Sequence, residues 1–106
     1  MIRRQVDWWT EALEDFDEAF QWYESRRTGL GVEFAEEAAA HIDSLLRFPL
    51  AHPIALKEMR RTILRRFPYG IYYLVEEKRI VVLAVLHLKR DTLSLLLRRT
   101  GVQPPR

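Results

Sequence analysis

The sequence contains no cysteine, and it is poor in the residue patterns that support enzyme chemistry. Without cysteine there is no disulfide framework, no thiolate nucleophile and no cysteine-ligated zinc site. None of the serines stands in a Gly-x-Ser-x-Gly turn, and the glycines form no phosphate-binding loop. The three histidines share no short spacing typical of metal ligands: they are His41, His52 and His87. We therefore expect no catalytic residue, no metal and no cofactor.

Long hydrophobic runs are also missing. The longest, Ile80 to Leu86, is far shorter than the roughly 20 residues that a membrane-spanning helix needs. The N-terminal residues carry charge, but no apolar stretch typical of a secretion signal follows them. With 106 residues, of which 48% are hydrophobic and 30% charged, the chain is typical of one globular domain spanning residues 1–106. We expect a cytoplasmic protein without membrane contact.

Charge is divided unevenly along the chain, although the net charge is only +2. Residues 1–53 carry 5 basic and 11 acidic side chains, whereas residues 54–106 carry 12 basic and 4 acidic ones. An acidic half followed by a basic half favours a folded body with one basic face. Two ordinary solvated surfaces would give the same division.

Two amphipathic helices are predicted in the acidic half. Thr10 is the expected N-cap of the first helix, whose apolar residues recur at spacings of three and four: Ala12, Phe16, Ala19, Phe20 and Tyr23. The segment 26–31 contains two glycines and should break this helix. The second helix has its own apolar series and must end before Pro49: Phe34, Ala35, Ala38, Ile42, Leu45 and Leu46. Together they form an antiparallel helical hairpin.

Strands are predicted in the basic half. Segments 60–67, 69–76 and 80–86 are rich in β-branched and aromatic residues and favour an antiparallel meander. Segment 80–86 is apolar throughout, as in a strand that is covered on both faces. Residues 2–9 are interpreted as a short edge strand, a short helix should precede Gly101, and residues 103–106 should form a frayed tail.

The predicted fold class is therefore α+β. The N-terminal helical hairpin packs on one face of a small, mainly antiparallel sheet, and a short C-terminal helix follows. We expect the second sheet face to be wet or covered by a partner, with strand arginines and tyrosines along it.

One basic and aromatic set of residues has a composition suited to function. It admits three interpretations: a solvated face beside half-buried tyrosines, a surface for an acidic protein segment, or a site that stabilises the transition state of RNA cleavage. Its members are Arg60, Arg61, Arg65, Arg66, Tyr69, Tyr72, Tyr73, His87, Lys89 and Arg90.

The chain resembles the ParE branch of the RelE/ParE toxin superfamily. The resemblance is most specific in segment 65–73, RRFPYGIYY, and in segment 80–91, IVVLAVLHLKRD. Segment 14–24, EDFDEAFQWYE, and the step from Leu30-Gly31 to Phe34 also look like that branch. The similarity extends from about residue 6 to residue 92.

This resemblance implies the toxin of a type II toxin–antitoxin module, of the kind involved in plasmid stabilisation and growth arrest. A cognate antitoxin, small and carrying a ribbon-helix-helix or similar DNA-binding domain, would wrap the toxin in a hetero-oligomer. ParE-like toxins usually block DNA gyrase by binding, whereas RelE-like toxins cleave mRNA on the ribosome.

The residues favour the ParE branch. RelE-like ribonucleases carry a basic residue where this chain has Gly70, and a further basic residue where it has Ile63. They also place a tyrosine near the C-terminus, and residues 92–101 hold none. Many ParE relatives, however, have proline and then tryptophan where this chain has Thr92 and Leu95.

We therefore expect a toxin that is not an enzyme and that inhibits DNA gyrase by binding. The alternatives are a RelE-like ribonuclease and a non-toxic, antitoxin-binding relic. The target-binding residues should be the basic cluster that projects after the last strand: His87, Lys89, Arg90, Arg98 and Arg99. Contacts to the antitoxin or to an anion are expected from Arg61, Arg65 and Tyr73.

Overall fold

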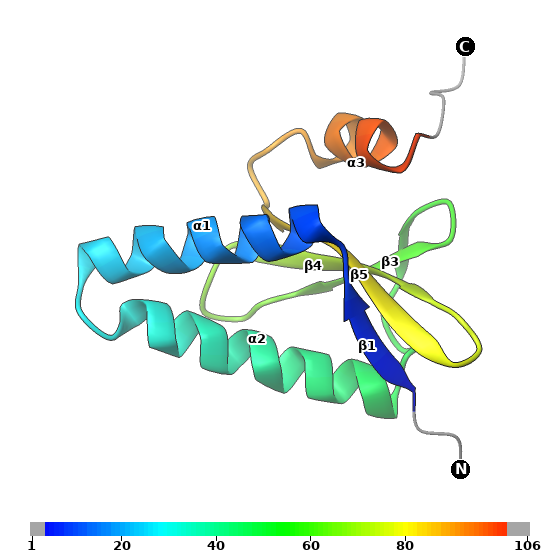
Figure 1. The fold of residues 1–106 in the computed structure, drawn as a ribbon, viewed down its shortest axis with the longest axis horizontal. Coiled ribbons are helices and arrows are strands. Elements are labelled where there is room, and N and C mark those ends of the chain that lie inside the picture. The colour runs from blue at the N-terminus through cyan, green and yellow to red at the C-terminus, as the bar shows by residue number, and fades with distance from the viewer. Residues whose placement is uncertain (1–3, 102–106) are drawn as a thin grey trace.

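The fold of this chain is described by a computed structural model over residues 4–101. The elements follow in the order β1 (Gln5–Trp8), α1 (Thr10–Arg26), α2 (Leu30–Arg47), β2 (Ile54–Leu56), β3 (Met59–Ile63), β4 (Tyr69–Val75), β5 (Arg79–His87) and α3 (Thr92–Thr100) (Figure 1). The α+β class, the edge strand near the N-terminus, the helical hairpin and the C-terminal helix are all confirmed. The predicted tail 103–106 lies outside the described residues.

The strands form one sheet with the order β1-β5-β4-β3-β2. Strands β3, β4 and β5 form the predicted antiparallel meander, with β4 between the other two. Strand β1 lies at the edge and runs parallel to β5, from Gln5 opposite Arg79 to Trp8 opposite Val82. The sequence analysis missed β2, because three residues are too few for an alternating pattern to be recognised.

Helices α1 and α2 lie side by side on one face of the sheet (Figure 1). Phe34 of α2 is fully buried at the centre of this layer. Its ring centroid lies 5.3–5.5 Å from four other rings, at the offset and edge-on angles that aromatic pairs prefer: Phe16, Tyr23, Phe67 and Tyr69. Burial of one such side chain contributes about 2–3 kcal/mol to stability.

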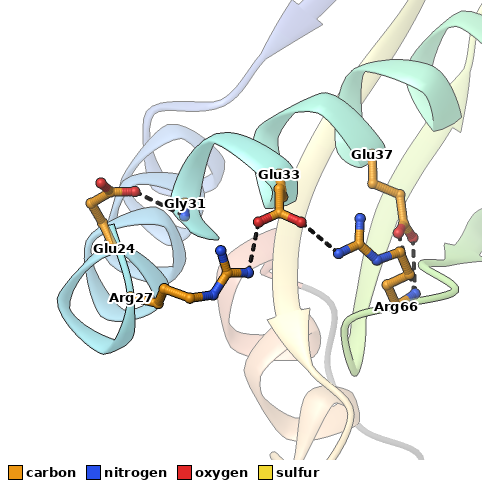
Figure 2. A network of polar contacts seen from close by, with 6 residues as sticks. All are labelled: Glu24, Arg27, Gly31, Glu33, Glu37 and Arg66. Atoms are coloured by element: carbon orange, nitrogen blue, oxygen red, sulfur yellow. Dashed lines mark hydrogen bonds and ion pairs between the residues drawn. The ribbon is translucent and has the colours of Figure 1, made fainter. Parts of the chain in front are cut away.

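The turn between the helices is tighter than the sequence predicted, because α2 already begins at Leu30. Glu24 holds the turn by accepting hydrogen bonds from the backbone N–H groups of Gly29 (2.9 Å) and Gly31 (3.0 Å), of which Figure 2 shows the second. A Cβ atom at residue 31 would lie 2.8 Å from the Phe20 carbonyl oxygen, so glycine is required there. The prediction of Thr10 as the N-cap of α1 was wrong by one position: Trp9 occupies it and makes no side-chain cap bond.

Carboxylates of α2 hold the loop between β3 and β4. Glu37 accepts hydrogen bonds from the backbone N–H groups of Arg65 and Arg66. Glu33 pairs with the Arg66 and Arg27 side chains, each at 2.7 Å, and Figure 2 shows these pairs together with the bond from Arg66 to Glu37. The hydrogen bonds from Arg66 and Arg27 lower the pKa of the Glu33 carboxyl below its ordinary value. This loop explains why the predicted strand 60–67 ends at Ile63.

The sequence analysis expected the second face of the sheet to be wet or covered by a partner, but the chain itself covers it. Helix α3 packs over it through Leu96, which is buried against a cluster from three strands: Met59, Tyr72, Val81, Leu83, Ala84 and Leu86. Strand β5 is therefore buried on both faces from Ile80 to Leu86, as predicted. Of the two adjacent tyrosines in β4, Tyr72 faces α3 and Tyr73 faces the helical hairpin, and both are buried.

An ion pair between Asp15 of α1 and Arg99 of α3 joins the two layers at the edge of β5. Their side chains are only 9% and 12% exposed, and Arg99 Nη1 lies 2.6 Å from Asp15 Oδ2. Asp15 Oδ2 also accepts a hydrogen bond from the Val85 N–H (3.0 Å), and Arg99 donates one to the Leu83 carbonyl (3.1 Å). The pair thus occupies the place beside β5 that a longer β1 would fill.

None of the described helices is long and apolar enough to cross a membrane.

We predict that Arg99→Met destabilises the protein by about 3 kcal/mol, because it leaves a nearly buried carboxylate without its cation. Urea unfolding of the purified protein measures the loss. The double variant Asp15→Asn with Arg99→Met should recover part of it, since the amide oxygen still accepts the Val85 N–H and no charge is left unpaired. Arg98→Met, one residue away and exposed, is the matched control, with an expected change below about 0.5 kcal/mol. Equal losses in the two single variants would contradict the structural role of the pair.

Candidate functional site

A rigid basic loop follows β5. We use the name basic loop for residues 87–91, which connect β5 to α3. Backbone bonds fix its path: the Leu88 N–H donates to the Pro68 carbonyl (2.8 Å), and the Arg90 N–H donates to the His87 carbonyl (3.1 Å). Lys89 and Arg90 are exposed, and no acidic side chain within residues 4–101 forms an ion pair with either.

His87 has a local structural role in this loop. Its Nδ1 atom accepts a hydrogen bond from the Lys89 N–H (3.1 Å), and its ring packs edge-on against Tyr69 at a centroid distance of 5.2 Å. The accepting role assigns the proton of the neutral ring to Nε2. The imidazole therefore braces the backbone that presents Lys89.

Asp91 is the one acidic residue of the loop, and it acts as the N-cap of α3. Its carboxylate accepts a hydrogen bond from the Ser94 N–H (3.2 Å). This bond lowers the pKa of the Asp91 carboxyl, and the nearby Arg98 charge lowers it further. Arg98 is exposed on α3, and its charge acts on Asp91 at the end of the basic loop.

Arg99 does not join this surface, although the sequence analysis had expected it to project. It turns inward to Asp15, as described above. Helix geometry explains why Arg98 and Arg99 point in different directions. Adjacent residues lie about 100° apart around a helix, so Arg98 faces solvent while Arg99 faces the sheet edge.

The other predicted contact residues do not form a common site. Tyr73 is 0% exposed, and its hydroxyl donates a hydrogen bond to the Pro49 carbonyl (3.0 Å). Burial raises the pKa of the Tyr73 phenol. Arg61 lies over Tyr72, with its guanidinium carbon 5.9 Å from the ring centroid, whereas Arg65 is exposed in the loop held by Glu37. Tyr73 is therefore a core residue, and its complete burial does not fit the predicted contact to the antitoxin or an anion.

A groove of about 460 Å³ lies between α1 and the end of β5. Its walls include Glu18 and Trp22 from α1 and His87 and Arg90 from the basic loop, with Tyr23, Pro68, Tyr69 and Val85 among the remaining lining residues. Burial raises the pKa values of the Tyr23 and Tyr69 phenols, so both rings are neutral. The groove therefore combines an uncharged aromatic lining with one acidic and one basic wall.

Comparison with known proteins identifies the family. The family model described as "ParE toxin of type II toxin-antitoxin system, parDE" matches residues 6–92. The chain belongs to the ParE toxin family. A solved structure titled "Chromosomal ParDE TA system from P. aeruginosa" superimposes with a TM-score of 0.72, covering 82% of this chain and 98% of that one at 16% identity. No curated protein sequence gives a significant match.

In this ParE-family chain, Gly70 occupies the position at which the sequence analysis expects a basic residue in RelE-like ribonucleases. Gly70 is buried in β4, and a Cβ atom there would lie 3.1–3.2 Å from side-chain atoms of Arg61 and Tyr72. A lysine or arginine at residue 70 would have to displace both. The glycine is thus part of the packing of this sheet face.

The sequence analysis assigned no function to Trp22 and Glu18, which form the α1 wall of the groove. Trp22 precedes the buried Tyr23 and stands at the border of the apolar stripe, where its side chain is 51% exposed. A tryptophan at the border of the apolar stripe was the only signal in the sequence. In the structure, the guanidinium carbon of Arg26 lies over the Trp22 ring, 4.4 Å from its centroid. Only the fold shows that Trp22 lines the groove beside α1.

We predict that Tyr73→Phe destabilises the ParE-family chain by about 1 kcal/mol, because the Pro49 carbonyl loses its hydrogen-bond donor. Chemical denaturation measures this loss. Affinity for a protein partner, measured by calorimetry below the unfolding transition, should not change. A weakened complex with an unchanged unfolding free energy would instead make Tyr73 a contact residue.

Proposed function

We propose that this ParE-family toxin inhibits DNA gyrase by binding, without chemistry of its own, and that it acts in the cytoplasm. The observation that supports the proposal is a set of three exposed basic side chains, two in the loop after β5 and one on α3, none of which forms an ion pair within residues 4–101: Lys89, Arg90 and Arg98. Gyrase engaged with DNA is an anionic target, and unpaired surface cations accelerate association with such a target. Backbone hydrogen bonds from Leu88 and Arg90 hold the path of the loop that carries Lys89 and Arg90, which reduces the entropy cost of ordering this backbone on binding.

The same region supports binding better than ribonuclease chemistry. RNA cleavage requires several preorganised cations around the developing charge. Here Arg66 is bound to Glu33 and Arg99 to Asp15, so neither is available for this purpose. Tyr72 and Tyr73 are buried, which leaves no exposed tyrosine beside Arg61 in β4. We therefore propose that the toxin acts by binding and not by RNA cleavage.

We also propose that a cognate antitoxin neutralises the toxin in a hetero-oligomer. The family match supports an antitoxin partner, and the proposed antitoxin is small and carries a ribbon-helix-helix or similar DNA-binding domain. A partner that binds only the folded toxin stabilises it by mass action. The neighbouring reading frame is the source from which to express it.

We predict that Lys89→Glu with Arg90→Glu abolishes growth arrest and slows association with gyrase at least tenfold. The fold should persist because both side chains are exposed. Supercoiling and DNA-cleavage assays with purified gyrase measure inhibition. Lys57→Glu with Lys78→Glu is the matched control, since both residues are exposed, lie in other turns and give the same change in net charge.

Equal inhibition by the two double variants would remove the basic loop from the mechanism. Absence of inhibition by the wild-type protein would contradict gyrase as the target and would favour a non-toxic, antitoxin-binding protein.

We predict no ribosome-dependent mRNA cleavage, because the required cations are absent or already paired. Primer extension on a translated message, with and without induction of the toxin, tests this. Codon-specific cuts that disappear with His87→Ala or Arg65→Ala would contradict the binding mechanism and favour a RelE-like ribonuclease.

A further inference from the structure

Large apolar side chains are exposed where α2 leads into β2. We use the name apolar edge for three of them: Phe48, Leu50 and Ile54. They are 63%, 64% and 56% exposed, more than any other large hydrophobic side chain within residues 4–101. Exposed apolar side chains that are scattered singly need no explanation, whereas a group of them on one surface marks an interaction site.

The backbone that carries Phe48 and Leu50 is bound to the sheet from the inside. The Pro49 carbonyl accepts a hydrogen bond from the buried Tyr73 hydroxyl (3.0 Å), and the His52 carbonyl accepts one from the Arg60 guanidinium (2.7 Å). Because these carbonyls are bound, the segment has a fixed path with its apolar side chains outside. A partner that covers them therefore has little backbone entropy to remove.

Strand β2 places Ile54 on the same side as this segment. Ile54 lies opposite Arg60 of β3, and directly opposite residues of paired strands share a face of the sheet. Arg60 reaches the His52 carbonyl, so this is also the face on which the segment lies. The register shift between Ile54 and Leu56 turns Leu56 to the other face, where it packs in the cluster with Met59. Ile54 thus extends the apolar surface of the segment.

The outer edge of β2 has no strand beside it in the described part of the chain, because β2 is the last strand of the sheet. The strand has three residues and contains the register shift, which disfavours continuous strand pairing across this edge. A partner would therefore bind mainly through the side chains of the apolar edge.

Charged side chains flank the apolar edge at both ends. Asp43 and Arg47 precede it on the last turns of α2, where both are exposed and their charged groups lie 3.2 Å apart. Lys57 and Glu58 follow it, exposed in the turn between β2 and β3. The end of α2 and this turn lie apart on the same side of the molecule (Figure 1). The four charges sum to zero, and each end carries one charge of each sign.

This balance favours a second copy of the same surface as the partner. A surface that meets itself about a twofold axis must be self-complementary in charge. Such an axis at the middle of the apolar edge brings the end of α2 in one copy opposite the β2–β3 turn in the other. Arg47 can then pair with Glu58 of the second copy, and Asp43 with Lys57.

We infer that two copies of this chain associate through the apolar edge about a twofold axis. The three apolar side chains would form the centre of the contact and the four charged ones its rim, the arrangement usual in protein interfaces. The accessible surface of one chain is 7070 Å², and a specific contact covers about a tenth of the surface of a small protein. The exposed side chains between residues 43 and 58 are the source of that area. The basic loop lies outside this surface, so the inference does not depend on the proposed target.

The first test is the mass of the purified chain in solution. Analytical ultracentrifugation should give the mass of two chains at about 50 µM and of one chain below about 1 µM, as expected for a weak contact near the lower limit of interface size. Leu50→Glu should raise the dissociation constant at least about 30-fold, because it places charge at the centre of the contact. Val32→Glu is the matched control, since Val32 is 48% exposed at the opposite end of α2.

The second test uses the twofold pairing of charges. Arg47→Glu alone and Glu58→Arg alone should each weaken the dimer, because both rim contacts then join like charges. An equimolar mixture of the two variants should recover it, because each contact then joins a glutamate and an arginine. Both side chains are exposed, so neither change should disturb the fold.

Four outcomes separate the possibilities. A dimer that Leu50→Glu weakens selectively and that the mixture recovers supports the inference. A wild-type chain that stays single at the higher concentration overturns it, and a complex with the adjacent antitoxin that Leu50→Glu weakens would then assign the apolar edge to that protein. A dimer that is equal in Leu50→Glu and Val32→Glu also overturns it, because another surface must then form the contact. Selective loss without recovery in the mixture overturns the twofold arrangement.

Discussion

The ion pair between Asp15 and Arg99 provides hydrogen-bond partners for backbone groups of β5 that lie beyond the end of β1. Strand β1 ends while β5 continues, and β5 also contains a bulge: Tyr72 pairs with Ala84 and Tyr73 with Val82, which leaves Leu83 as the extra residue. Backbone groups beyond the end of β1 would therefore lack partners in a nearly buried position. The carboxylate accepts from Val85 and the guanidinium donates to Leu83, and each neutralises the other. One pair thus provides partners for the Val85 N–H and the Leu83 carbonyl and fixes α3 to the sheet.

The basic loop and the groove beside α1 both depend on this arrangement. The basic loop begins where β5 ends, and its position relative to the sheet is fixed by α3 and by the bond from Leu88 to Pro68. The groove exists because α1, not a strand, lies beside the last residues of β5. An extension of β1 by a few residues would close the groove and remove the need for Asp15. The early end of one edge strand therefore leaves a groove beside the residues that we propose for the target.

Most elements of the fold could be predicted from the sequence, because a helix that buries one face has apolar residues at regular spacing. The apolar stripe around Phe34 predicted α2, and the unbroken apolar run of segment 80–86 predicted β5 as a strand covered on both faces. Periodicity could not show which way Arg99 turns, since a cation at a helix edge is compatible with either solvent or a partner from another element. The same limit applies to Tyr73: its hydroxyl made it a candidate contact residue, and only the fold revealed the Pro49 carbonyl as its acceptor. Non-local polar partners leave no pattern in one sequence, so the site was less predictable than the fold.

The distribution of charge around α1 determines from which side an anionic target is attracted to the protein. The exposed side of α1 carries four acidic residues without a paired cation in the described part of the chain: Glu11, Glu14, Asp17 and Glu18. This helix repels a polyanion such as DNA and leaves the basic loop as the favourable direction of approach.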